Sequence, residues 1–600
     1  MSKGLKGNSE TLKEIYEYYT QGNIHEMEGL LKDVSEEDLS NLDDKLTYKV
    51  LQSYLIQLGG NFEEGYQLAN QISHESEVQG KLIHFVDICI ILAEILERTG
   101  KYKECIAIIE KGEQTLAKIQ SLDFKALNHK KAWLIHYRGR ISWWKGNYDS
   151  ALNCFEETLT IRKEIENDHD LAVSLQNIGL IYIEKGQSER GFDYHQQALE
   201  LFRKVGNKHR LAWCLQNLGA LASTQGNYDQ ALIYQQESCK LCEEIGNKDS
   251  ISWSLVNLGS LFNIKGDLNR ALDYYQQSLV IRNEIGNKEM IINSHLFITG
   301  VYKQKGELDQ ALVYLRNAEE LIEESDNKNM LINPLFHYAN IYWAKGEIKK
   351  AMEYMQRIFL LTDEPGIYLG DLGFSFAYFW MIIFSLEINN LEQAKKYLQL
   401  SKAISDKTND KILLPKIQQN YYLAEALILK KSSRIRDKVK AQDYLEQAID
   451  DESIASLFKE MAMINLCELL LDELRIYGNP QVLEEVKELV KKLYTRAQDQ
   501  GSFSLVVNAL SMQAKLALVE GNISKAEQLL EQANITAKEK GLNLLEKNVA
   551  NEKRKLESQY DEWKKMIEEN ASFGERLEQA RLSAYLKEAA KYVSVGNIEK

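Results

Sequence analysis

The chain contains very little proline, and this scarcity restricts its fold class. Only four prolines occur among 600 residues, namely Pro334, Pro365, Pro415 and Pro480. Proline disrupts a helix interior because it lacks an amide hydrogen and its ring clashes with the preceding turn. Apolar residues make up 44% of the chain and charged residues 27%, a composition typical of folded rather than disordered proteins. We therefore expect a folded chain that is almost entirely helical.

The sequence also lacks the common short motifs of catalytic sites. No GxxxxGK[ST], GxGxxG, HExxH or GxSxG motif occurs in it. Its ten histidines are scattered, and acidic residues are so frequent that a chance pair of carboxylates carries no information. We therefore expect no enzymatic activity, no catalytic residue and no cofactor.

Cysteine usage indicates neither a disulfide framework nor a metal site. The seven cysteines are odd in number and widely spaced, unlike the cysteines of small secreted domains. Cys239 and Cys242 form a CxxC motif, but it falls in the middle of an expected helix and no second motif completes a zinc site. We interpret the pair as two small packed residues, and we expect no metal.

Net positive charge and membrane-spanning segments are absent as well. The formal net charge is −15, which disfavours nucleic acid as a partner, because such binding depends on neutralising phosphates. The first residues have no apolar signal-peptide core. The longest apolar stretch, Phe374 to Leu386, is too short to cross a bilayer. We expect a cytoplasmic protein.

Glycine, in contrast, recurs at a fixed spacing of forty residues. The series comprises Gly146, Gly186, Gly226, Gly266, Gly306 and Gly346. A small residue follows each glycine five positions later, for example Ala231 and Ala271. Each glycine ends a stretch with helical apolar spacing and suits the left-handed position that closes a helix. A period of this length predicts a solenoid of helix pairs, in which each pair buries its apolar face against its neighbours.

The repeated unit resembles the tetratricopeptide repeat. Asn177-Ile178-Gly179 with Tyr182, followed by Gly186 and Ala198, matches the small and large positions of that family. The forty-residue period and the Gly206-Asn207-Lys208 type of turn resemble the longer-repeat branch, which includes Pins/LGN-type polarity adaptors and kinesin light chains. The resemblance implies an all-α fold: a right-handed superhelical solenoid of antiparallel helix hairpins. It also implies a concave groove lined by the first helix of each pair.

The regularity of the period divides the chain into four parts. We expect divergent helical repeats in residues 1–130, a regular array in 131–360, divergent repeats in 361–541, and capping helices in 542–600. The last part is expected to contain one long charged helix up to Glu569 and then a helix with an apolar stripe of Leu582, Leu586, Ala589 and Val593. The stripe either covers the repeat around Ala526, which leaves a monomer, or mediates dimerisation.

Placing residues at 100° per step identifies a stripe on each first helix that faces away from the partner helix. Tryptophan and asparagine recur on it. The candidate contacts for an extended peptide are Trp133, Tyr137, Arg140, Trp144, Asn177, Trp213, Asn217, Trp253, Asn257, Phe297 and His337. Asparagine can donate to and accept from a peptide backbone, and tryptophan anchors apolar side chains. Alternatively, the asparagines bond to neighbouring repeats and the tryptophans pack between adjacent first helices.

Two functions remain open at this stage. The first is a scaffold that holds an extended peptide or a segment of a partner protein in the groove. The second is a regulatory array that senses a small peptide or metabolite. A clamp of two lysines for a C-terminal carboxylate is not evident on the stripe, where Arg140 is the only basic residue.

Overall fold

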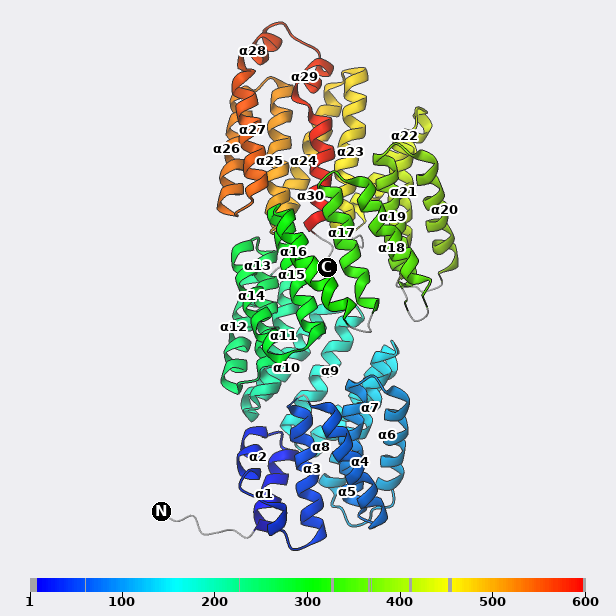
Figure 1. Cartoon of the computed structure of the whole chain (residues 1–600), viewed down its shortest axis with the longest axis vertical. Coiled ribbons are helices and arrows are strands. Elements are labelled where there is room, and N and C mark those ends of the chain that lie inside the picture. The colour runs from blue at the N-terminus through cyan, green and yellow to red at the C-terminus, as the bar shows by residue number, and fades with distance from the viewer. Residues whose placement is uncertain are drawn as a thin grey trace. The chain divides into compact units, whose positions relative to one another are not determined.

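The structure is a computed structural model that describes residues 8–596, except residues 60, 226, 325–327, 365–366, 368, 409–412 and 452–455. Within these residues the chain forms α-helices α1 to α30 and two short 3-10 helices, and no strand (Figure 1). Most helices contact the next helix in the chain across a turn of a few residues. The predicted all-α fold of tandem helix hairpins is confirmed.

The chain divides into two compact units, Met1–Ser250 and Ile251–Lys600, which we call unit 1 and unit 2. The boundary falls inside the regular array of residues 131–360 and not at either of its ends. The forty-residue period of the sequence continues through the boundary. The four-part division drawn from the sequence stays a prediction.

Unit 1 begins with α1 (Asn8–Thr20), α2 (Ile24–Leu31) and the 3-10 helix η1 (Glu36–Asp38). Five hairpins follow. Their first helices are α3 (Leu42–Leu58), α5 (Leu82–Arg98), α7 (Phe124–Trp144), α9 (Asp168–Glu184) and α11 (Lys208–Thr224). Their second helices are α4 (Phe62–Val78), α6 (Tyr102–Leu116), α8 (Tyr148–Glu164), α10 (Ser188–Val205) and α12 (Tyr228–Ile245).

Unit 2 contains seven hairpins and a C-terminal group. The first helices are α13 (Lys248–Ile264, which crosses the unit boundary), α15 (Lys288–Lys305), α17 (Ile332–Ala344), α19 (Gly370–Glu387), α21 (Leu413–Lys430), α23 (Ser456–Tyr477) and α25 (Phe503–Glu520). The second helices are α14 (Leu268–Ile285), α16 (Leu308–Glu323), α18 (Ile348–Thr362), α20 (Leu391–Lys407), α22 (Ile435–Asp450), α24 (Pro480–Asp499) and α26 (Ile523–Glu539). The 3-10 helix η2 (Lys328–Leu331) precedes α17.

Asparagine and glycine set the ends of the regular helices, as their positions in the repeat suggest. The side chains of Asn167 and Asn207 accept the backbone N–H three residues ahead and so begin α9 and α11. Gly206 and Gly246 end α10 and α12 with φ of 79° and 74°. These left-handed angles are available to glycine without the steric cost that a side chain imposes.

A glycine in the middle of a first helix receives a side chain from its own second helix. A Cβ added to Gly179 would lie 2.3 Å from His195 Nδ1, and one added to Gly259 would lie 2.7 Å from the ring of Tyr275. His195 is fully buried, and its Nδ1 lies 2.9 Å from the carbonyl of Gly191. The close helix approach expected at these glycines is therefore present, and His195 is a packed imidazole.

The C-terminal group differs from the sequence prediction in two respects. Instead of one helix up to Glu569, the chain forms α27 (Asn543–Ser558) and α28 (Tyr560–Glu568), because the helix breaks at Gln559, where Trp563 turns into the core. After α29 (Phe573–Ala580), α30 (Leu582–Gly596) contacts α15, α17, α23 and α25 (Figure 1). It thus contacts the Ala526 repeat through the first helix of that repeat, α25, and extends over three further first helices as well. The side chain of Val593 lies outside the described residues.

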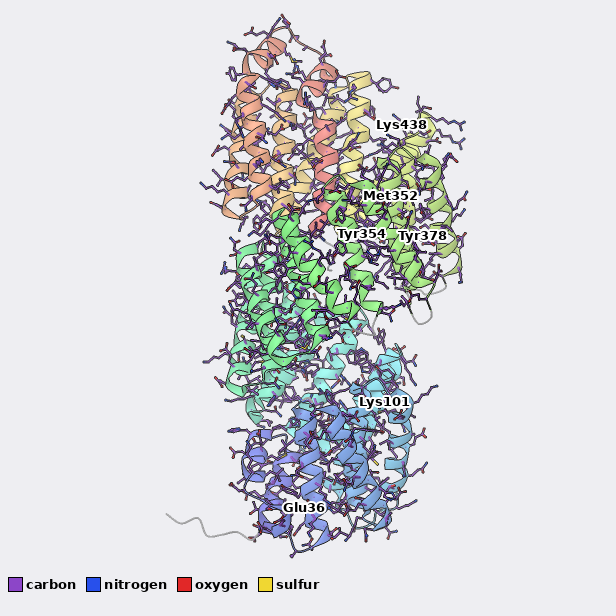
Figure 2. The ribbon with its side chains drawn as sticks, viewed as in Figure 1. Glu36, Lys101, Met352, Tyr354, Tyr378 and Lys438 are labelled. Carbon is purple, nitrogen blue, oxygen red and sulfur yellow. The ribbon has the colours of Figure 1, made fainter. Side chains whose placement is uncertain are left out.

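Aromatic side chains add a packed layer to unit 2 around α17 to α20. The rings of Tyr342 and Tyr354 stack with centroids 5.4 Å apart, and those of Phe359 and Tyr378 with centroids 5.2 Å apart. Figure 2 labels Tyr354 and Tyr378 on the neighbouring helices α18 and α19. These contacts belong to the hairpin packing.

One described helix is long and apolar enough to cross a membrane, Phe503–Glu520, which is α25. The fold buries 78% of this segment. Its apolar character is therefore explained by its position in the core of unit 2.

Candidate binding surface on the first helices

In each unit one terminal helix packs against first helices, and these contacts define what we call the inner face of that unit. In unit 1 the end of α1 contacts side chains of α3, α5 and α7, and Gly22 in the turn that follows α1 lies against His169 of α9. In unit 2 the corresponding helix is α30, and its partners are again first helices. In unit 1, Tyr16 of α1 contacts Lys130 of α7, one helical turn before the predicted contact residue Trp133.

Three predicted contact residues of α7 bind acidic side chains of α5. The hydroxyl of Tyr137 donates to Glu94 at 3.1 Å, and Arg140 pairs with Glu97 at 2.7 Å. Trp144, although 52% exposed, donates its indole N–H to Glu97 as well. These side chains thus bridge neighbouring repeats, which was the alternative interpretation of the stripe.

Two of the predicted tryptophans cover buried arginines. The guanidinium of Arg162 lies 4.6 Å from the ring centroid of Trp133, and that of Arg282 lies 4.7 Å from Trp253. Both arginines are fully buried and donate to serine hydroxyls and backbone carbonyls. Cation–π contact with an indole helps to compensate for their desolvation. The sequence analysis did not identify these arginines. They occupy the same position of the repeat, three repeats apart, and this spacing could have identified them.

The predicted asparagines differ in their accessibility. Asn177 is 3% exposed: its amide donates to the carbonyl of Val173 at 2.7 Å, and its Oδ1 is buried with no partner among the described residues. Asn217 and Asn257 are partly exposed. Asn217 Nδ2 is buried and makes no hydrogen bond within the described part of the chain. Of the three predicted asparagines, Asn217 and Asn257 are therefore the more exposed.

The remaining predicted contacts occupy different environments. Trp213 is partly exposed. In its repeat, the position that corresponds to Arg162 is occupied by the buried Cys242, so this position offers no arginine for the indole to cover. Phe297 stacks on Tyr275 with centroids 5.3 Å apart. His337 is buried beside Lys303 at 3.2 Å, and burial together with this cation lowers its pKa well below the usual value. His337 is thus part of the core of unit 2.

The inner face of unit 1 holds the end of α1 through a buried charged cluster. Lys130 and Asp87 form an ion pair with side-chain exposures of 4% and 5%. The hydroxyl of Tyr16 donates to Asp87 at 2.9 Å and accepts from Lys130 at 2.8 Å. Burial and the adjacent carboxylate raise the pKa of Tyr16 well above its usual value, so this hydroxyl stays protonated and remains a donor.

The turn between α1 and α2 is held by two helix-capping asparagines that lie forty residues apart. The side-chain amide of Asn167 donates to the carbonyl of Thr20 at 3.0 Å, and that of Asn207 donates to the carbonyl of Gly22 at 2.6 Å. Each asparagine uses its Oδ1 for the cap and its amide for the turn. The sequence analysis attributed Asn207 only to a turn between repeats and did not identify Asn167.

The inner face of unit 2 holds α30 mainly through apolar contact. Leu582, Leu586 and Ala589 are each 1% exposed. Two polar contacts accompany them: the hydroxyl of Tyr585 donates to Asn508 Oδ1 at 3.0 Å, and Lys515 donates to the carbonyl of Ala580 at 2.9 Å. Asn508 lies on α25 and also back-bonds to Ser504, as Asn177 does to Val173.

Metal ligation finds no support among the described residues, which contain no group of three or more histidine, cysteine or acidic side chains that could hold an ion. The cysteines are free, and burial raises the pKa of Cys239 to about 11. A thiol with that pKa is neutral near pH 7 and is a poor metal ligand.

Comparisons with known proteins place the repeats in a family. The tetratricopeptide-repeat models match residues 131–190, 171–244, 225–284 and 332–363. The comparison with curated proteins gave no match.

Three solved structures illustrate the range of similar helical arrays. The quorum sensor NprR from B. thuringiensis is 15% identical, with 61% of this chain and 99% of that one covered at a TM-score of 0.44. BtubC from P. vanneervenii is 19% identical, covering 39% and 92% at 0.31. A kinesin light chain with TPR-like repeats from Podosopora anserina is 13% identical, covering 32% and 96% at 0.29. All three scores are below 0.5, so the family rests on the sequence models together with the helix-hairpin fold. The chain contains tetratricopeptide repeats, in residues 131–284 and 332–363.

Proposed function

We propose that the chain is a non-enzymatic scaffold that binds a segment of a partner protein on the inner faces of its first helices. The supporting observation is that in each unit an asparagine side chain helps to hold a terminal segment of this chain. In unit 1, Asn207 donates to the carbonyl of Gly22; in unit 2, Asn508 accepts from Tyr585. A surface that binds one chain segment in this way has the chemistry to bind another.

The accessible parts of the stripe are the proposed contact areas for the partner, one in each unit. In unit 1 the area comprises Trp213 and Asn217 on α11, and in unit 2 it comprises Trp253 and Asn257 on α13. Trp253 is 41% exposed, so one part of its ring remains available after it covers Arg282. The partner segment is expected to be extended, to carry apolar side chains that contact the indoles, and to offer backbone groups to the asparagines.

Affinity capture with the full-length protein from native extract, followed by mass spectrometry, would identify the partner. The dissociation constant is then measured for Asn217→Ala combined with Asn257→Ala. Each lost neutral hydrogen bond costs about 1 kcal/mol, so the double variant should bind roughly thirtyfold more weakly. Circular dichroism should show unchanged helix content.

The matched control replaces exposed asparagines on second helices, Asn153→Ala with Asn317→Ala. This control should bind the partner like the parent protein. Equal capture by the stripe variant and the parent would place the binding site elsewhere, and equal weakening by the control would show that the effect is not specific to the stripe.

A second candidate function is a regulatory array that senses a small ligand or a short peptide. It is favoured by a partly enclosed cavity in unit 2 whose lining includes Phe297 and three further stripe residues, Ser260, Ile264 and Gln304. A ligand-dependent change in small-angle X-ray scattering would support this function; identical scattering curves at saturating ligand would oppose it.

A further inference from the structure

A small cavity lies on the inner face of unit 1, beside the last residues of α1. Its volume is about 30 Å³, which is enough for about two water-sized atoms. Side chains of α1, α3, α5, α7, α9 and α11 line it, among them the predicted contact residues Trp133 and Tyr137. These helices come from successive repeats, so the cavity exists only in the folded unit.

Three charged side chains line the cavity, and the two acidic ones already have partners. Asp170 lies 3.0 Å from His169 Nδ1, and Glu94 pairs with Arg98 at 3.3 Å. The third is Arg210 of α11, which is partly exposed. Its guanidinium makes no hydrogen bond or ion pair with any residue that the structure describes. The lining therefore offers one positive charge that no carboxylate contacts.

Two tyrosine hydroxyls add unused donors to the same lining. The rings of Tyr19 and Tyr54 meet edge to face with centroids 4.8 Å apart, and both side chains are partly exposed. Neither hydroxyl makes a hydrogen bond within the described part of the chain, and both oxygens keep accessible surface. Burial raises the pKa of both tyrosines, and the nearby charge of Arg210 opposes that rise at Tyr54. Both hydroxyls therefore stay protonated near pH 7 and can donate.

Arg210 lies on the same side of α11 as the accessible contact area of unit 1. It precedes Asn217 by seven positions, so the two residues are within about 20° of each other around the helix and about 10 Å apart along it. Trp213 lies between them along the axis. A partner segment that contacts Trp213 and Asn217 can therefore also reach Arg210.

We infer that this cavity receives the side-chain carboxylate of a glutamate or aspartate from the partner segment. One carboxylate oxygen accepts from the guanidinium of Arg210, and the other accepts from the tyrosine hydroxyls. The inference deepens the proposed function, because it rests on the inner face of unit 1 being a binding surface for the partner.

Charge and size together select this class of ligand. An ammonium group would be repelled by Arg210 and would find both acidic residues already paired. An amide carbonyl can accept from Arg210, but a hydrogen bond between two charged groups is about twice as strong as one between neutral groups. A phosphate group carries four oxygens, whereas the cavity has room for about two water-sized atoms.

The test uses the full chain and ligand-observed saturation-transfer NMR. The probe is N-acetyl-L-glutamate N-methylamide, and the glutamine derivative of the same shape is its neutral counterpart. We expect the glutamine derivative to bind at least tenfold more weakly at low ionic strength. Added salt should weaken the glutamate probe more than the glutamine derivative, because it screens the charge of Arg210.

Two variants remove the donors one at a time. Arg210→Gln should weaken the glutamate probe at least tenfold and abolish its preference over the glutamine derivative. Tyr54→Phe keeps the ring, removes one hydroxyl and should weaken the probe about tenfold. The matched control is Arg203→Gln on α10, an exposed arginine that pairs with Glu237, and it should leave probe binding unchanged.

Three outcomes would overturn the inference. They are equal binding of the glutamate and glutamine derivatives to the parent protein, no binding of either derivative, and unchanged binding of the glutamate probe by both variants. The second outcome would mean that the cavity holds only water. Tighter binding of N-acetyl-L-alanine, whose carboxylate ends the chain, would overturn the assignment to a side chain.

A separate measurement distinguishes this site from the proposed function. Partner capture through Asn217 and Asn257 is measured without the probe. Stripe-dependent capture without probe binding removes only the carboxylate site. Probe binding that depends on Arg210, without stripe-dependent capture, removes only the scaffold.

Discussion

The two units cover their inner faces with terminal helices of opposite chemistry. In unit 1 the end of α1 meets the first helices through the buried Lys130–Asp87 pair, the Tyr16 hydroxyl and two asparagine amides. In unit 2, α30 presents leucine and alanine to the first helices and adds only a few polar contacts. The same repeat architecture thus supports a charged contact in one unit and an apolar contact in the other.

This difference predicts different tolerances to substitution. A buried ion pair requires both partners in a fixed geometry, because either charge alone is strongly destabilising in a dry environment. Apolar contacts depend on volume and accept substitutions of similar size. We therefore expect the α1 contact to fail when one charge is removed, and the α30 contact to weaken in proportion to the apolar volume that is lost.

The largest effect is expected for Lys130→Ala in unit 1. This change leaves Asp87 buried without a counter-ion and should destabilise the unit by about 3–5 kcal/mol. Replacing both members, Lys130→Met with Asp87→Leu, should recover most of that loss. Hydrogen exchange of peptides from α5 and α7 measures the local stability. The exposed neighbour Lys131→Ala serves as control and should change it by less than about 1 kcal/mol.

Leu586→Ala should destabilise unit 2 by about 2–5 kcal/mol, because it leaves a cavity under α30. Urea unfolding followed by hydrogen exchange of α23 and α25 would report the loss, with the exposed Lys587→Ala as control. Light scattering of the same variant tests the alternative role of this stripe. A dimeric parent protein that becomes a monomer in the variant would indicate self-association through α30.

Acidification should destabilise unit 1 more than unit 2. Burial lowers the pKa of histidines in both units; they are His84, His136, His169, His195 and His209 in unit 1, and His295 and His337 in unit 2. For His195 the pKa falls to about 4. Between that pH and about 6.5 the unfolded state binds the proton and the folded state does not, so stability decreases as the pH falls through this window.

For His195 alone the loss amounts to about 3 kcal/mol once the pH is below both values. Hydrogen exchange at pH 7.5 and pH 5 would compare the two units. His195→Gln keeps a polar side chain of similar size at this position and should reduce the acid sensitivity of α9 and α10. Loss of protection in unit 2 before unit 1 would contradict the expected order.

The smallest loss of stability is expected for substitutions of helix-capping asparagines. Comparing two of them distinguishes the contribution of the cap from that of the contact with the α1–α2 turn. Asn207 caps α11 and donates to Gly22, whereas Asn287 caps α15 and makes no second hydrogen bond among the described residues. Asn207→Ala and Asn287→Ala should each lose about 1 kcal/mol of cap stability. Asn207→Ala should lose about 1 kcal/mol more. Equal losses would mean that the contact with Gly22 contributes nothing.

Local features of the fold were readable from the sequence because they depend on nearby residues. A glycine that ends a helix and an asparagine that begins the next one act within one turn, so their period of forty residues predicted the hairpins. The break at Gln559 was not predicted, because the charged residues around it are compatible with a continuous helix. It is the burial of Trp563 that accompanies the break in the folded unit.

The candidate site was only partly predictable from the sequence. The helical wheel placed a stripe away from the second helix, although Trp133 and Trp253 cover arginines of their own second helices, α8 and α14. It could not show that Tyr137 and Arg140 bind acidic residues of α5, or that Asn177 and His337 are buried. Those outcomes depend on which side chains a neighbouring repeat contributes, and their sequence separation leaves no short-range signal.

The sequence alone determined the all-α class and the hairpin repeat, since periodicity and helix geometry are local properties. Only the tertiary structure decided which parts of the predicted stripe stay accessible. Two terminal helices of the same chain occupy the inner faces, and their contacts join residues 114 positions apart at Tyr16–Lys130 and 77 positions apart at Asn508–Tyr585. Contacts over such separations depend on the packing of the whole unit, and no repeat pattern encodes them.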